Sequence, residues 1–153
     1  MCFRQRPKDI QELKTAIYQV LKVLEIVHNS GYVHRDLRWE NIWKDSYGRF
    51  IVGDWEHAGR LDKIPKFVIQ WWAPELYNVP TPPYTDEADI YLVGGLLNTA
   101  GVLLLNEAVT FHSLLMKNDP DEHPSAVNAL QHQWLNKLNF KCQNNILYIT
   151  VSK

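Results

Sequence analysis

The first thirty residues carry a clear periodic pattern of apolar positions. Apolar side chains recur there at three- and four-residue steps, which places them on one face of a helix. They are Ile10, Leu13, Ile17, Val20, Leu21, Leu24 and Val27. Gly31 follows the last of them and can end a helix through a left-handed C-cap. We therefore predict an amphipathic helix that begins near Ile10 and is terminated by Gly31.

A β-hairpin is predicted next. The segments Ile42-Trp43-Lys44 and Arg49-Phe50-Ile51-Val52 flank Asp45-Ser46-Tyr47-Gly48, whose residues favour a turn. We expect this hairpin to hold Asn41 and Asp54 at opposite ends of a rigid ribbon. Residues 56–72 lack a periodic pattern and are predicted to be irregular.

The second half of the chain predicts more helix. Thr85-Asp86-Glu87 has the acidic character of a helix start, and it follows a proline-rich loop. The stretch from Ile90 to Leu105 is apolar on nearly every side, which is typical of a helix buried all round. The fold class predicted is therefore mainly α, with one short β-hairpin.

Composition narrows the class of protein. The chain has 153 residues with 46% hydrophobic content, enough for one domain with a substantial core. Sixteen basic and 17 acidic residues give a formal charge of -1 without runs of like charge, so no nucleic-acid partner is indicated. Cys2 and Cys142 lie at opposite ends, which argues against a disulfide framework and a zinc site.

No membrane partner is indicated either. The first eight residues have no apolar core like that of a signal peptide. The run from Leu92 to Leu105 is interrupted by Asn98 and Thr99 and is shorter than the ~20 residues of a membrane span. We expect an intracellular, cytoplasmic protein.

Four motifs then point to one family. Tyr32-Val33-His34-Arg35-Asp36-Leu37-Arg38-Trp39-Glu40-Asn41 resembles the catalytic loop of eukaryotic protein kinases. Gly53-Asp54-Trp55-Glu56 follows where that family has its metal-binding Asp-Phe-Gly, and Ala73-Pro74-Glu75 matches its Ala-Pro-Glu. Asp89-Ile90-Tyr91-Leu92-Val93-Gly94 matches its Asp-x-Trp-x-x-Gly. The order of all four motifs is that of the family.

The resemblance implies a fold for the chain and indicates which residues that fold covers. Residues 1–138 are similar to a protein kinase C-lobe, in which residues 90–105 correspond to the central helix. Residues 111–120 and 124–135 resemble the last two helices, and residues 139–153 stay an unassigned tail. Nothing upstream of residue 10 resembles the glycine-rich loop, strand Lys or helix Glu of the N-lobe. The chain thus resembles a C-lobe without its N-lobe.

The resemblance also implies ATP and Mg²⁺ as cofactors. Asp36 would be the catalytic base, Arg38 would contact the γ-phosphate, and Asn41 would bind a second Mg²⁺. Asp54 would bind the principal Mg²⁺, because hard oxygen ligands suit this cation.

The resemblance also implies that two further residues take part in nucleotide binding. Trp43 stands where the family usually has the Leu that forms the floor of the adenine pocket, so its larger ring would encroach there. Gly53, just before Asp54, would leave space. Trp43, Gly53 and Asp54 are therefore the candidate cofactor-binding residues.

Several positions depart from the family. Glu56 replaces a Gly of the metal-binding loop, where a Cβ restricts positive φ. The span 54–75 contains no Ser, Thr or Tyr, so this loop offers no hydroxyl to phosphorylate. Arg35, which in the family often captures that phosphate, is expected to find Asp62, Glu56 or nothing. His123 replaces the Arg expected to pair with Glu75, which predicts a weaker buried pair.

Three functions stay open at this level. The first is a protein kinase that phosphorylates a protein substrate on serine or tyrosine, with weak or no activity in the isolated chain because the N-lobe supplies much of the ATP site. The second is a pseudokinase-like module that binds a partner protein through the exposed face where an N-lobe would dock. The third, ranked last, is a small-molecule phosphotransferase, since residues 54–59 resemble aminoglycoside and choline kinases.

Overall fold

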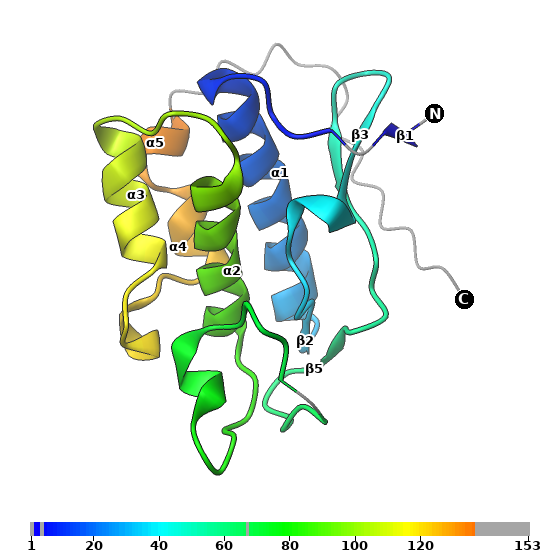
Figure 1. Cartoon of the computed structure of the whole chain (residues 1–153), viewed down its shortest axis with the longest axis vertical. Coiled ribbons are helices and arrows are strands. Elements are labelled where there is room, and N and C mark those ends of the chain that lie inside the picture. Colours follow the sequence, from blue (N-terminus) through cyan, green and yellow to red (C-terminus); the bar gives the residue numbers. More distant parts are fainter. Residues whose placement is uncertain (1, 4, 67, 137–153) are drawn as a thin grey trace.

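The computed structural model describes residues 2–3, 5–66 and 68–136 of the chain, which form a mostly helical body with short antiparallel strands on one side (Figure 1). Helices α1 (Ile10–Asn29) and α2 (Asp86–Thr99) pack against each other in its centre. Helices α3 (Glu107–Leu115), α4 (Ala126–Leu130) and α5 (Gln133–Asn136) cover them on the side away from the strands. The residues assigned to the tail, 139–153, lie outside the described residues.

Helix α1 confirms the first sequence prediction. The Asp9 carboxylate caps its N-terminus by accepting a hydrogen bond of 2.8 Å from the Glu12 amide. Gly31 follows its C-terminus with φ +77°, the left-handed conformation that glycine adopts without a steric penalty. The apolar face enters the core along its whole length except at Ile10, which is 40% exposed.

The predicted hairpin is present as β3 (Ile42–Asp45) and β4 (Phe50–Val52). Ile42 pairs with Val52 in an antiparallel register, so the residues that precede β3 and follow β4 meet at the same end of the hairpin. The expectation that Asn41 and Asp54 lie at opposite ends of the ribbon is therefore wrong. Antiparallel strands joined by a tight turn necessarily bring their outer ends together.

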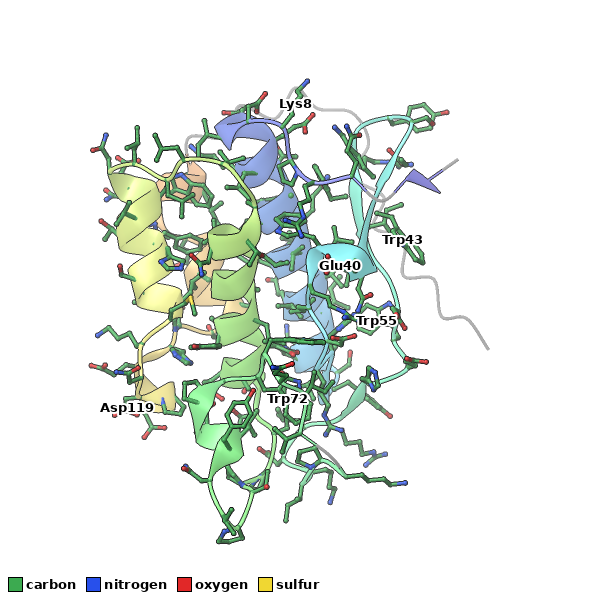
Figure 2. All side chains as sticks on the ribbon, viewed as in Figure 1. Lys8, Glu40, Trp43, Trp55, Trp72 and Asp119 are labelled. Carbon is green, nitrogen blue, oxygen red and sulfur yellow. The ribbon has the colours of Figure 1, made fainter. Side chains whose placement is uncertain are left out.

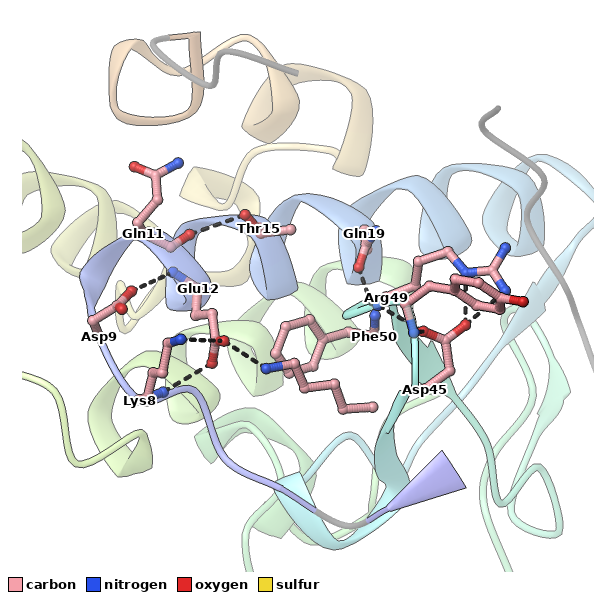
Figure 3. Close-up of polar contacts among 11 residues, drawn as sticks. Lys8, Asp9, Gln11, Glu12, Thr15, Gln19, Asp45, Arg49 and Phe50 are labelled. Carbon is pink, nitrogen blue, oxygen red and sulfur yellow. Dashed lines mark hydrogen bonds and ion pairs between the residues drawn. The ribbon is translucent and has the colours of Figure 1, made fainter. Parts of the chain in front are cut away.

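The turn of this hairpin is closed by one carboxylate. Asp45 accepts hydrogen bonds of 2.9 Å from the amides of Tyr47 and Arg49 and one of 2.6 Å from the Arg49 guanidinium (Figure 3). Burial opposes the ionised form, but these donors prevail and lower the pKa of Asp45. The hairpin is also tied to α1, because the Phe50 amide donates to the Gln19 side chain at 2.7 Å.

Three short strands were not predicted. Strand β1 (Cys2–Phe3) pairs with β3, and β2 (Tyr32–Val33) pairs with β5 (Gly59–Arg60). The expectation that residues 56–72 are irregular is thus wrong at Gly59–Arg60. A ladder of two residues has no periodicity to detect, and only its distant partner stabilises it.

The later helices differ in length from the sequence prediction. Helix α2 begins as expected after Thr85, but it ends at Thr99, and Leu103 and Leu105 are 77% and 61% exposed. The helix predicted to be buried as far as Leu105 is therefore too long. Gly101 at φ +75° turns the chain away from the helix axis. The predicted helix over 124–135 is divided into α4 and α5, whereas α3 begins earlier than residue 111.

The core is continuous across these elements. It lies between the apolar face of α1, the largely buried α2 and the inner faces of α3 and the hairpin. Among the described residues, no helix is both long enough and apolar enough to cross a membrane.

Candidate active site

Asp89 on α2 anchors the loop that contains the first motif. Its fully buried carboxylate accepts hydrogen bonds from the amides of His34 and Arg35 at 2.7 and 2.9 Å. The Tyr84 hydroxyl donates to it at 3.0 Å, and His28 Nε2 lies 3.0 Å away. Burial opposes ionisation, but the hydrogen bonds and the neighbouring imidazoles lower the pKa of Asp89. A charged Asp89 therefore fixes the loop backbone to the central helix.

His34 connects this loop to the segment that follows the hairpin. Its Nε2 lies 3.0 Å from the Gly53 carbonyl, and its Nδ1 accepts the Asp36 amide at 3.2 Å. These partners require the neutral tautomer with hydrogen on Nε2. Burial lowers the pKa of His34 and favours the same neutral form. Its ring also packs on Trp55 at 4.4 Å between centroids, in agreement with a structural role for both side chains.

Asp36 and Asn41 form a buried pair. The Asn41 amide nitrogen donates to Asp36 Oδ2 at 2.7 Å and to the Asp36 carbonyl at 2.9 Å. Asp36 and Asn41 are 1% and 2% exposed. Because the nitrogen of the Asn41 side chain is used in this way, its Oδ1 is the atom left for a cation.

The hairpin brings Asp54 to the same end as Asn41. The Gly53 amide donates to the Asn41 carbonyl at 2.9 Å, which links the two motifs directly. Asp54 has φ 58°, a left-handed conformation that Asp tolerates better than most residues. Within the described part of the chain, no donor is hydrogen-bonded to the Asp54 carboxylate, which leaves its oxygens as candidate ligands.

The donor set fits Mg²⁺. An Asp carboxylate and an Asn amide oxygen are hard ligands, and Mg²⁺ is commonly held by one or two carboxylates together with substrate phosphates. The residues described contain no group of three or more His, Cys, Asp or Glu side chains that could hold a metal ion. Asn41 and Asp54 are therefore the side chains that would hold a cation here.

The two candidate nucleotide residues on the hairpin touch each other. A Cβ built on Gly53 would lie 2.9 Å from the Trp43 ring, so that ring fills the room that the missing side chain leaves. Trp43 and Trp55 both lie on the strand side of the helical body (Figure 2). The space that Gly53 was expected to leave for a nucleotide is thus taken by Trp43.

Trp71 is a site residue that the sequence analysis missed. Its indole Nε1 donates to Asp36 Oδ1 at 3.1 Å. The Arg38 guanidinium lies over the Trp71 ring, 4.7 Å from its centroid, and Arg38 Nε is 3.4 Å from the same Asp36 oxygen. The only signal in the sequence was the position of Trp71, two residues before Ala73-Pro74-Glu75, which says nothing about its contact with Asp36.

Arg35 differs from its expected surroundings. Its guanidinium donates to the carbonyls of Arg60 and Lys63 at 3.1 and 3.4 Å, rather than to Asp62 or Glu56. It borders an open cavity of about 380 Å³ that Arg60, Lys63, Lys66 and Glu56 also line. Of the alternatives expected from the sequence, neither Asp62 nor Glu56 pairs with Arg35 among the described residues, and main-chain carbonyls take its donors instead.

Glu75 and His123 form no ion pair within the described residues. His123 Nε2 instead donates to the Lys117 carbonyl at 2.7 Å, and both Glu75 carboxylate oxygens are buried without a hydrogen-bond partner. Burial raises the pKa of Glu75, and an interaction with its own backbone and the electrostatic influence of His123 only partly offset this. The weakened buried pair predicted from the sequence is therefore not formed among the described residues, because the His123 ring turns to the Lys117 carbonyl instead.

Comparison with known proteins agrees with this geometry. A family model described as the protein kinase domain matches residues 2–102, which are 101 of the 153 residues. The chain belongs to the protein kinase family. This kinase-family sequence is 29% identical to Crinkler effector protein 8 of Phytophthora infestans over 135 residues, covering 82% of this chain and 22% of that protein.

Further relatives carry kinase names. Serine/threonine-protein kinase WNG1 of Toxoplasma gondii is 24% identical over 148 residues, covering 90% of this chain and 23% of that protein. Serine/threonine-protein kinase PAK 5 of Rattus norvegicus is 32% identical over 90 residues, covering 55% and 12%. The chain thus spans less than a quarter of the length of each of these three relatives. Protein kinases are transferases that generally use ATP and Mg²⁺.

Proposed function

We propose that residues 1–138 are the C-lobe of a protein kinase and that their site transfers the γ-phosphoryl group of MgATP to a protein hydroxyl. The observation that carries this proposal is the hydrogen-bonded pair of Asp36 and Asn41, with Asp54 at the same end of the hairpin. Phosphoryl transfer depends on positioning and charge stabilisation, and these three side chains are of the types it requires.

Each polar side chain has a role in this proposal. Asp36 orients the substrate hydroxyl and accepts its proton. Arg38 neutralises charge on the transferred phosphoryl group. Asn41 and Asp54 hold Mg²⁺, which when bound neutralises charge on the phosphates.

The substrate class proposed is a protein serine or threonine. Two relatives with kinase names are serine/threonine-protein kinases.

An N-lobe would complete the ATP site. Strands β1–β5 form only short ladders beside the helices, and none of them provides a glycine-rich loop over Asp54. The described residues therefore provide the part of the site that faces the substrate hydroxyl. We expect only weak ATP binding from them alone.

A second candidate function is a pseudokinase-like module that binds a partner protein through the face where an N-lobe docks. Two contacts favour it, because Trp71 covers Asp36 and Trp43 fills the space at Gly53. Both contacts oppose substrate and nucleotide binding in the conformation described.

Thermal unfolding with and without saturating Mg²⁺ and ATP separates the two candidates. A ligand at about 100 times its Kd stabilises the folded state by about 2.7 kcal/mol. We expect a rise in Tm that is lost in Asp54→Asn, a variant that keeps the left-handed backbone acceptable. The absence of a shift in the unmodified chain would reject nucleotide binding by this lobe and favour the binding module.

A further inference from the structure

We propose that Trp71 and Arg38 form a latch over the Asp36 carboxylate, and that a substrate hydroxyl reaches Asp36 only after the Trp71 side chain swings away. This inference rests on the proposed function, because it concerns access to the proposed base. The latch is defined by the indole hydrogen bond to Asp36 Oδ1 and by the stacking of Arg38 on the same indole.

The Asp36 carboxylate is engaged on both oxygens. Asn41 donates to Oδ2 at 2.7 Å, and Trp71 donates to Oδ1 at 3.1 Å. Each oxygen has a further lone pair, but the residue is only 1% exposed, so a hydroxyl has no open path to it. The Asn41 contact lies within the loop and orients the carboxylate, whereas the Trp71 contact comes from a different segment and closes it.

The latch can open without unfolding the segment that carries it. Trp71 is 42% exposed, so its ring has solvent on one side. The next residue, Trp72, is 4% exposed and donates to the Arg35 carbonyl at 2.5 Å, which fixes the backbone. Rotation of the Trp71 side chain about a fixed backbone therefore uncovers Asp36.

Arg38 couples the latch to phosphate. Its guanidinium stacks on Trp71, and its buried Nε lies 3.4 Å from Asp36 Oδ1 without forming a hydrogen bond. A phosphoryl group that attracts the guanidinium removes the cation from the indole and weakens the latch. Binding of the nucleotide would then favour the open form of the site.

Carboxyl labelling tests the latch without any requirement for nucleotide or activity. The folded chain is treated with a water-soluble carbodiimide and an amine, and modification of Asp36 is measured by mass spectrometry. Glu40, whose side chain is 52% exposed, is the internal reference because it lies in the same loop. Trp71→Phe removes the N–H donor and keeps a ring, and Trp71→Ala removes both.

We expect Asp36 labelling, relative to Glu40, to rise about tenfold in Trp71→Phe and at least as much in Trp71→Ala. Tenfold corresponds to about 1.4 kcal/mol, close to the lower end of the range for a hydrogen bond to a charged group. Trp43→Phe is the matched control and should leave the ratio unchanged, because none of the described hydrogen bonds joins Trp43 to Asp36.

Equal labelling in the unmodified chain and in Trp71→Phe would overturn the latch. If Trp71→Ala does not fold, the comparison with Trp71→Phe still decides. If labelling rises but MgATP gives no thermal shift, the latch stands and the proposed phosphoryl transfer fails. The two proposals are therefore tested separately.

Discussion

At the scale of single residues, the site depends on buried polar groups with fixed protonation. Asp89 is held charged by four partners, and His34 is held neutral between the Asp36 amide and the Gly53 carbonyl. In a low-dielectric interior, each of these groups would be costly without its partners. The loop that contains Asp36 thus owes its shape to two side chains that carry no chemistry in the proposed reaction.

The protonation of His34 predicts a loss of stability in mild acid. Its pKa is lowered from 6.5 in the folded state, so below pH 6.5 the unfolded chain takes up a proton that the folded chain excludes. The contribution of His34 is complete above pH 6.5 and is lost as the pH falls toward the folded-state pKa. One such group lowers the free energy of unfolding by up to about 1.4 kcal/mol per pH unit.

Urea unfolding at several pH values between 7.5 and 5.5 measures this slope, which is the change in the free energy of unfolding per pH unit. His34→Phe keeps an aromatic ring against Trp55 and cannot titrate, so its slope should be shallower than that of the unmodified chain. Burial also lowers the pKa values of His112 and His132, and these remain in both proteins. Identical slopes would show that His34 does not exclude the proton.

At the scale of elements, the β3–β4 hairpin is the part that assembles the site. Its antiparallel register places Asn41 and Asp54 at one end, and the Gly53 amide closes that end on the Asn41 carbonyl. The Trp43 ring of β3 packs across to Gly53, just after β4, so the hairpin has an internal contact where a nucleotide was expected. A substitution that disturbs this contact should therefore lower the free energy of unfolding of the chain.

Gly53→Ala tests that contact. Its Cβ would lie 2.9 Å from the Trp43 ring, and such overpacking typically costs about 1–3 kcal/mol. We expect the cost to fall below about 1 kcal/mol when Trp43→Leu is also present, because the smaller side chain leaves room. A double-mutant cycle in urea measures the difference. Equal costs in both backgrounds would mean that the Trp43 ring does not press on Gly53.

At the scale of the whole molecule, α1 packs against both helices and strands, which predicts that the chain unfolds as one cooperative unit. It packs against α2, α4 and α5 on one side and against β2 and β4 on the other. Unfolding of α1 would therefore expose core residues on both its helix side and its strand side. The hairpin and the helices should not unfold separately, although the site lies on the hairpin side.

Leu21→Ala in the middle of α1 should lower the stability of the helices and of the hairpin by the same amount. Leu21 is fully buried, and such truncations cost about 2–5 kcal/mol. Far-UV circular dichroism, which follows the helices, and tryptophan fluorescence, which includes Trp43 and Trp55 near the hairpin, should give the same urea midpoint. Ile26→Ala on the same helix is the control, since Ile26 is 40% exposed and should cost much less. Separate midpoints would show that the hairpin unfolds on its own.

Local sequence patterns were enough to predict a large part of the fold. The apolar period of α1, the Gly31 terminus and the turn residues of the hairpin act over a few positions, so sequence was sufficient to predict them. The order of the four motifs likewise indicated the protein kinase family, which the match of the family model confirms. Among the local predictions that failed is the length of α2, where apolar composition continues beyond the turn at Gly101.

Contacts between distant segments were decided only by the tertiary structure. The pairing of β2 with β5, the hydrogen bond from Trp71 to Asp36 and the shift of Arg35 to main-chain carbonyls join residues 25 or more positions apart. Sequence by itself determined which residues could serve the proposed chemistry, because side-chain type and local spacing are written in it. Whether the Asp36 carboxylate is open or covered depends on how packing orients a side chain 35 residues away, and no local pattern encodes that orientation.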